Sequence, residues 1–200
     1  MNRRDWLTAL GATLAVPLSD DLLDLGRALH ARAARRGEGG AALQVLSPQQ
    51  NELVTTLAEL ILPETDTPGA RAARVNELID LALAEWFDPA DRDHFLAGLA
   101  DVDARAKALG ATGFVHAPTA QQLEVLTTLD DELAQERDAE HAGSQWRGRA
   151  AAPDKNFFRW MKELTLVGYY TSEIGFTQEL RAQIIPGRYD GCILLERRGS

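Results

Sequence analysis

The amino-acid sequence predicts an all-α protein, with a single helical bundle domain over residues 41–200 and an irregular, partly extended C-terminal tail. Apolar residues recur at intervals of three and four, which is the period of a helix with one buried face. Proline, glycine and capping residues separate these stretches, and no convincing run alternates apolar and polar residues as a half-buried strand does. The hydrophobic fraction of 45% and the charged fraction of 26% are ordinary for a folded domain.

The first two helices are expected in the N-terminal third of this domain. Ser47 and Pro48 open the first one, because a hydroxyl suits the N-cap and proline suits the first helical position. Pro63 ends it, since proline cannot continue the hydrogen-bond pattern. The second helix is expected over residues 71–87, and its apolar face ends with Trp86.

Two more helices follow after short connections. Asp88 and Pro89 begin the third helix, and Gly110 provides the left-handed residue that commonly ends a helix. The fourth helix is expected to begin at a capping box, in which Thr119 is the N-cap residue and Gln122 stands three positions later. Leucines at helical spacing continue this helix.

The C-terminal quarter differs in character. Residues 138–156 are polar and nearly free of aliphatic side chains, which predicts a functional or mobile loop. Residues 157–170 form a helix that is apolar on most of its circumference, so this helix is either central to the core or a docking surface for a partner. A short helix is expected over residues 173–181, and residues 184–192 are expected to be extended with turns.

The N-terminus has the pattern of an export signal. Arg3 and Arg4 precede Trp6 and Leu7, and residues 7–18 carry no charge. A positive segment followed by an apolar one is typical of a secretory signal, and this apolar segment is shorter than the roughly 20 residues that span a bilayer. Paired arginines before a mildly hydrophobic segment favour the twin-arginine route, which exports proteins that have already folded.

Residues 1–40 are therefore interpreted as a twin-arginine-type signal segment and linker. Arg27 to Gly40 is rich in alanine, arginine and glycine and has little to bury, which favours a linker. No clean cleavage site of small residues stands near Leu18. The alternative is a cytosolic helical adaptor with a short amphipathic N-terminal helix, in which the arginine pair is incidental.

Charge and cysteine content exclude some classes of function. The net charge is −9, and residues 1–36 carry six arginines against four aspartates, so the acidity lies in the rest of the chain. Nucleic acid is not expected as a partner, because phosphate binding relies on lysine and arginine. Cys192 is the single cysteine, so the chain can form neither an internal disulfide nor a multi-cysteine metal site. We expect Cys192 to be a small buried residue.

No catalytic constellation emerges from the motifs. The glycines form no dinucleotide fingerprint, and no nucleophile elbow, zinc-protease motif or P-loop is present. Glu64 and Asp66 share a short loop with two threonines, which suggests either a capped turn or, less simply, a calcium site. Two metal ligands on one helix commonly stand three or four positions apart. None of the four histidines has another His or Cys at that spacing; they are His30, His94, His116 and His141.

Two long stretches, and a short one that follows the second, resemble the gluconate 2-dehydrogenase subunit 3 family. The first is ILPETDTPGARAARVNELIDLAL at residues 61–83, the second is FFRWMKELTLVGYYTSEIGFTQEL at residues 157–180, and the third is PGRYDGC at residues 186–192. Their order and separation match the family. The resemblance covers most of residues 47–195, and a twin-arginine leader is also typical of these subunits.

The resemblance implies a small subunit without a cofactor of its own. Its partner would be a large FAD-dependent catalytic subunit of the glucose-methanol-choline type, often joined by a cytochrome c subunit, acting on sugars, sugar acids or glycosides. This chain would carry the large subunit through the twin-arginine translocase to the periplasm, with membrane association through its partners. The residues expected at the partner interface are Pro68, Gly69, Phe157, Phe158, Trp160, Tyr169, Tyr189 and Gly191.

Besides the dehydrogenase subunit and the cytosolic adaptor, an enzyme that acts on its own stays open as an alternative. An independent exported enzyme would use a metal ion held by Glu64, Asp66 and a distant histidine. The interaction-subunit interpretation predicts instead that Phe158→Ala weakens assembly more than His94→Ala, because aromatic side chains dominate buried interface centres.

Overall fold

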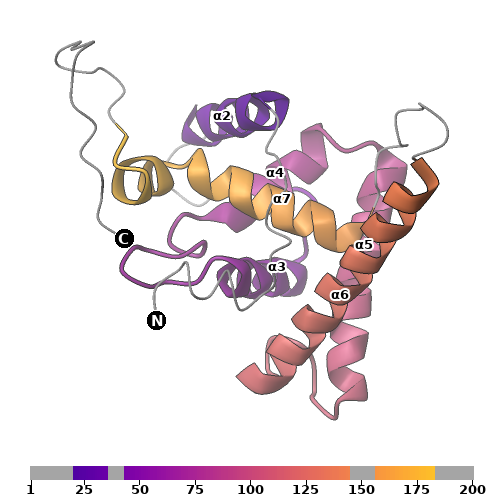
Figure 1. Ribbon diagram of the computed structural model, residues 1–200. Helices are drawn as coiled ribbons and strands as arrows, with labels where there is room; N and C mark the ends of the chain where they lie inside the picture. Colours follow the sequence, from indigo (N-terminus) through magenta and orange to yellow (C-terminus); the bar gives the residue numbers. More distant parts are fainter. Residues whose placement is uncertain (1–19, 36–42, 145–155, 183–200) are drawn as a thin grey trace, which may run out of the picture.

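The computed structural model describes residues 20–35, 43–144 and 156–182, and Figure 1 shows their arrangement. Within these ranges the chain is helical and contains no strand, so the predicted all-α class is confirmed. The elements are α2 (Asp20–Arg35), α3 (Pro48–Ile61), α4 (Val75–Glu85), α5 (Pro89–Ala108), α6 (Thr119–Ser144), α7 (Phe157–Tyr170) and the π-helix η2 (Gly175–Glu179).

Helix α3 begins and ends where the sequence predicts. The Ser47 hydroxyl accepts a hydrogen bond from the Gln50 backbone N–H (3.3 Å), and the Gln50 side chain accepts one from the Ser47 N–H (2.9 Å). These reciprocal bonds form a capping box, which satisfies two backbone donors at the start of the helix. The last helical residue, Ile61, stands just before Pro63.

Helix α4 is shorter at both ends than the predicted helix over residues 71–87. It begins at Val75 because Arg74 adopts a left-handed conformation with φ of 54°, which a continuous helix does not allow. It ends at Glu85, so Trp86 lies beyond the last turn. The assignment of Trp86 to the buried face is wrong, since this side chain is 53% exposed.

The boundaries of α5 are confirmed and those of α6 need two corrections. Asp88 caps α5 by accepting a hydrogen bond from Asp91 N (2.8 Å), and Gly110 ends it with φ of 90°. The capping box predicted at Thr119 does not form, because Thr119 is already the first helical residue and the Gln122 backbone N–H donates to the carbonyl of Pro118 (3.1 Å). The Gln122 side-chain amide donates to the carbonyl of Phe114 (2.9 Å).

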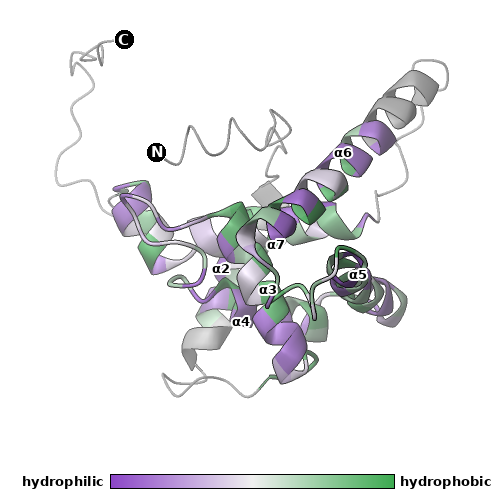
Figure 2. Ribbon diagram, turned by 90° about the horizontal axis from the view of Figure 1, so that it is seen from below, coloured by the Kyte–Doolittle hydropathy of each residue, from purple (hydrophilic) through white to green (hydrophobic). Residues whose placement is uncertain are grey.

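The helix α6 is also longer than the sequence predicts. It continues to Ser144, so the expected loop over residues 138–156 is wrong for its first part, and residues 145–155 lie outside the described ranges. Hydrophilic and hydrophobic residues alternate along α6 (Figure 2), and the side chains of Leu126, Leu129 and Leu133 are buried. The polar residues from 138 to 144 therefore belong to a helix and not to a loop.

Helix α7 lies at the centre of the molecule (Figure 1) and contacts α2, α3, α4, α5 and α6. Its boundaries agree with the predicted helix over residues 157–170. A helix surrounded on nearly all sides buries nearly all of its side chains, which explains why it is apolar on most of its circumference. The structure thus places this helix in the core.

The helix α2 corrects the linker interpretation. Residues 20–35 pack against α4 and α7, so the part of the proposed linker from Arg27 to Arg35 is a docked helix. Leu29 is buried, and a side chain in place of Gly26 would overlap Val167 of α7. The remainder of the proposed signal segment and linker, residues 1–19 and 36–40, lies outside the described part of the chain.

A buried carboxylate of α4 holds the segment that leads into α3. Asp80 accepts hydrogen bonds from the backbone N–H groups of Gln44 (2.8 Å), Val45 (3.0 Å) and Leu46 (2.8 Å). Three donors compensate for the loss of water around the buried charge. Asp80 therefore fixes the direction in which the chain enters the bundle.

Candidate functional site

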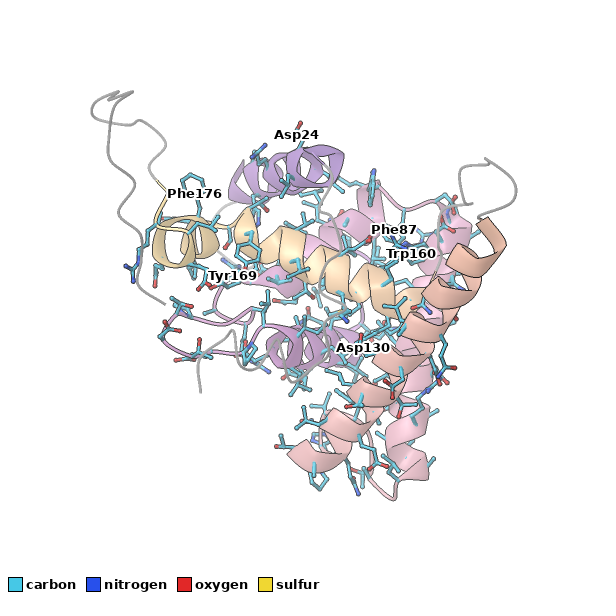
Figure 3. All side chains as sticks on the ribbon, viewed as in Figure 1. Asp24, Phe87, Asp130, Trp160, Tyr169 and Phe176 are labelled. Atoms are coloured by element: carbon cyan, nitrogen blue, oxygen red, sulfur yellow. The ribbon has the colours of Figure 1, made fainter. Side chains whose placement is uncertain are left out.

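The expected interface residues within the described ranges lie toward the two ends of α7. Figure 3 shows Trp160 close to Phe87 at one end and Tyr169 at the other. Arg3, Arg4, Trp6, Leu7, Tyr189 and Gly191 lie outside the described residues, so their assigned roles stay predictions. The two ends of α7 present different chemistry and are considered in turn.

The loop between α3 and α4, residues 62–74, is folded around one carboxylate. Glu59 accepts hydrogen bonds from the backbone N–H groups of Glu64 (2.9 Å) and Arg71 (2.8 Å). The carbonyl of Leu62 accepts a further bond from Ala70 N (2.9 Å) and closes the loop. A Cβ atom on Gly69 would overlap the Glu59 carboxylate, so glycine at this position allows the close approach.

This loop is bonded to the segment that follows α7. The Tyr169 hydroxyl donates to the carbonyl of Pro68 (2.7 Å), and the Thr67 hydroxyl donates to the Glu179 carboxylate (2.5 Å). These two bonds join stretches about a hundred positions apart in the sequence, which are the stretches that carry the family resemblance. The loop, the end of α7 and η2 therefore form one structural unit.

The possible metal site at Glu64 and Asp66 is not supported by this geometry. Both residues are exposed, and Asp66 accepts a hydrogen bond from the Thr65 hydroxyl (2.9 Å). Among the described residues, no group of three or more His, Cys, Asp and Glu side chains could hold a metal ion. The alternative of an independent metal-dependent enzyme gains no supporting observation.

The other end of α7 carries a cluster of aromatic rings at the surface. We call Trp86, Phe87, His94 and Trp160 the aromatic patch. Phe87 makes edge-to-face contacts with Trp160 (5.0 Å between centroids) and with Trp86 (5.7 Å), and His94 contacts Trp160 in the same manner (5.8 Å). Trp86 is the most exposed large apolar residue here, whereas Phe87 and Trp160 are half-buried.

Two of the expected interface residues at this end are core residues of the chain itself. Phe157 is 8% exposed and Phe158 is 3% exposed, and the Phe157 ring packs edge-to-face on Phe95 (5.1 Å). Tyr169, at the far end of α7, is fully buried. Trp160 alone among the aromatic candidates in the described residues has substantial exposed surface.

A groove between α5 and α6 adjoins the aromatic patch and has a volume of about 560 Å³. Arg105 lies in it and forms ion pairs with Glu132 (2.7 Å) and Asp101 (2.6 Å). The hydrogen bond to Glu132 is the largest cause that raises the pKa of the Arg105 guanidinium above its usual range, and the hydrogen bond to Asp101 raises it further. His94 lines this groove and also belongs to the aromatic patch, so the two features are continuous.

A buried ion pair joins α6 to α7 beneath this surface. The ammonium of Lys162 contacts the carboxylate of Asp130, and the two side chains are only 6% and 11% exposed. The same ammonium lies over the ring of Phe158, 5.2 Å from its centroid. Because buried charges require partners, this pair fixes how α7 sits against α6.

Sequence reasoning missed Trp86 and Phe87 as surface residues. Trp86 and Phe87 stand immediately before Asp88 and Pro89, the pair that begins α5. Residues between two helices have solvent on at least one side. The aromatic pair at this junction therefore could have indicated an exposed cluster. It was overlooked because Trp86 also fits the helical spacing of the apolar residues before it.

A half-buried histidine joins α2 to α7. His30 Nε2 lies 2.8 Å from the carbonyl of Gly168, and because a carbonyl only accepts, Nε2 carries the hydrogen. Burial lowers the pKa of His30 below its usual value, and the bond to Gly168 offsets part of this effect. Of the other histidines, His94 and His116 are exposed at separate places.

The stability of the protein should therefore fall as the pH drops below the ordinary histidine pKa of 6.5. Below pH 6.5 the histidine of the unfolded chain binds a proton, whereas His30 of the folded chain, with its lower pKa, does not yet do so. Protons therefore favour the unfolded chain, and the stability present above pH 6.5 is lost as the pH falls toward the pKa of folded His30. Urea unfolding at about pH 7.5 and about pH 5.5 measures this loss. His30→Gln, which retains a donor but does not titrate, should lose less stability; equal losses would contradict the assignment.

The comparisons with known proteins give one match. A family model described as Gluconate 2-dehydrogenase subunit 3 matches residues 48–187, which is more than half of the chain. No curated protein matches the chain, and no solved structure does. In the described part of the chain, every helix is too short or too polar to qualify as a membrane span.

Proposed function

We propose that this chain, which belongs to the gluconate 2-dehydrogenase subunit 3 family, is the non-catalytic small subunit of its dehydrogenase complex. The family is one of subunits of dehydrogenase complexes. The family match over residues 48–187 is the observation that carries the proposal. The chain acts as an export carrier and as a folding partner for the catalytic subunit.

The catalytic partner is a large FAD-dependent subunit of the glucose-methanol-choline type. It acts on a sugar, a sugar acid or a glycoside, and a cytochrome c subunit accepts its electrons. The small subunit supplies no reactive group to this chemistry. This division of roles is supported by the sequence, which lacks a dinucleotide fingerprint.

Export follows the twin-arginine route to the periplasm, where the complex associates with the membrane through its other subunits. Arg3, Arg4, Trp6 and Leu7 form the recognition segment. A flavoprotein that loads its cofactor before export must travel folded, and a partner with the signal can carry it. Binding the folded form also stabilises the catalytic subunit by mass action.

Replacing Arg3 and Arg4 together by lysine should abolish export of both subunits, since the paired arginines define the route. The measurement is the fraction of each subunit in the periplasm when the two are produced together. A matched variant, Arg35→Lys, changes a third arginine outside the signal and should leave export unchanged. Export of the catalytic subunit that is indifferent to Arg3 and Arg4 would contradict the carrier role.

The folding role is tested by producing the catalytic subunit with and without this chain. Without the chain, the catalytic subunit should contain less bound flavin and show less dehydrogenase activity. Normal flavin content, export and activity without the chain would overturn the proposal. Turnover of a sugar by the isolated small subunit would favour the independent enzyme instead.

A further inference from the structure

We infer that the aromatic patch and the adjoining groove between α5 and α6 form one docking surface for a cationic segment of the catalytic subunit. The inference rests on the proposed function and adds to it the place and the chemistry of contact. Its centre is Trp86, and its acidic side is the groove that contains Asp101, Glu132 and Glu136.

The aromatic patch has the properties of an interface centre. Trp86 is 53% exposed, yet it is held in place by the edge-to-face contact with Phe87, which in turn packs on Trp160. A tryptophan supported from below loses little conformational freedom on binding, and tryptophan is the residue type most enriched among dominant interface contacts. The Trp86 ring is therefore preorganised for binding a partner.

The groove beside the patch is acidic. Its lining contains three carboxylates, from Asp101, Glu132 and Glu136, and the single guanidinium of Arg105, so these four groups sum to a charge of −2. Arg105 is already paired with two of the carboxylates. The excess negative potential is therefore available to attract a positively charged segment.

The kind of partner follows from these two features together. Guanidinium and ammonium groups bind both the faces of tryptophan rings and carboxylates. A segment with lysine or arginine beside an apolar side chain would place the apolar group on the aromatic patch and the cation in the groove. An acidic or purely apolar segment would leave the charge of the groove uncompensated.

Trp86→Ala and Asp101→Lys test the surface in the complex formed by co-produced subunits. Trp86→Ala should weaken binding of the catalytic subunit by at least about 30-fold, as loss of a dominant interface contact does. Asp101→Lys should weaken binding by about tenfold, mainly through slower association, and reduce the salt dependence of that rate. Surface plasmon resonance of purified subunits measures both.

Matched controls come from the opposite end of α7. Leu180, at the end of η2, is also 53% exposed, and Glu173 is an exposed carboxylate nearby. Leu180→Ala and Glu173→Lys should change the affinity by less than about threefold, as changes away from an interface centre do. Circular dichroism of each variant confirms that the chain is folded, and Trp86 is exposed enough that its truncation leaves the core intact.

Each outcome decides the question. If the unaltered chain binds the catalytic subunit but Trp86→Ala and Asp101→Lys bind equally well, the docking surface lies elsewhere and the inference fails while the proposed function stands. If the unaltered chain does not bind, the proposed function itself fails. A Trp86-dependent dimer of the isolated chain, or faster hydrogen exchange in α5 after removal of residues 1–19, would assign the surface to another occupant and overturn the inference.

Discussion

Replacing Asp130 by alanine should lower the free energy of unfolding by about 3–5 kcal/mol, because the change leaves the buried ammonium of Lys162 without a counter-charge. Both side chains are almost fully covered, so water cannot replace the lost carboxylate. Figure 3 shows Asp130 on α6, facing the centre of the molecule. Urea denaturation followed by circular dichroism measures the change.

Two further variants separate the charge effect from a general effect of mutating α6. Asp131→Ala removes an exposed carboxylate from the adjacent position and should change the stability by less than about 0.5 kcal/mol. The double variant Asp130→Leu with Lys162→Met replaces the pair by apolar side chains and should recover most of the loss, because the desolvation cost disappears with the charges. A loss below about 1 kcal/mol for Asp130→Ala would show that Lys162 finds another partner or solvent.

Replacing Phe158 by alanine should lower the free energy of unfolding by about 3–5 kcal/mol, since a buried ring is lost and a cavity remains. Phe158 also lies beneath the ammonium of Lys162, so the same change removes a favourable contact with that cation. His94→Ala is the matched control at the same end of α7, because His94 is exposed. Its cost should be about 1 kcal/mol or less.

The effect of these two variants on assembly follows from their positions. Phe158→Ala should reduce the yield of complex more than His94→Ala, as the sequence predicts, but the cause is the lower stability of the subunit itself. Affinities measured with folded protein, after removal of aggregates, should show no such excess for Phe158→Ala. A large affinity loss for a fully folded Phe158→Ala variant would place this ring at the interface after all.

The helices could be predicted from sequence because their signals are local. Ser47 and Pro48 define the start of α3, Asp88 and Pro89 the start of α5, and Gly110 the end of α5 through its left-handed conformation. The apolar circumference of residues 157–170 likewise depends only on composition within one helix. Each of these features works through contacts a few residues apart.

The remainder depends on contacts between distant residues. The loop over residues 62–74 takes its shape from Glu59, Tyr169 and Glu179, and no local pattern shows that these side chains meet it. Gln122 matches a capping pattern, yet the helix begins one residue earlier than that pattern requires, and the Gln122 N–H donates to the carbonyl of Pro118. At the candidate site, the sequence correctly indicates that α7 is rich in aromatic and apolar residues. Which of these side chains are exposed depends on the helices that surround α7, and these contacts cannot be read from a local pattern.

The position of α7 also sets when the protein can finish folding. Five helices that precede it in the sequence lie against it. During synthesis, the apolar faces of those helices lack their common neighbour until α7 itself has left the ribosome. The core therefore cannot close around the earlier helices alone, and their exposed apolar faces favour aggregation of the nascent chain until α7 is available.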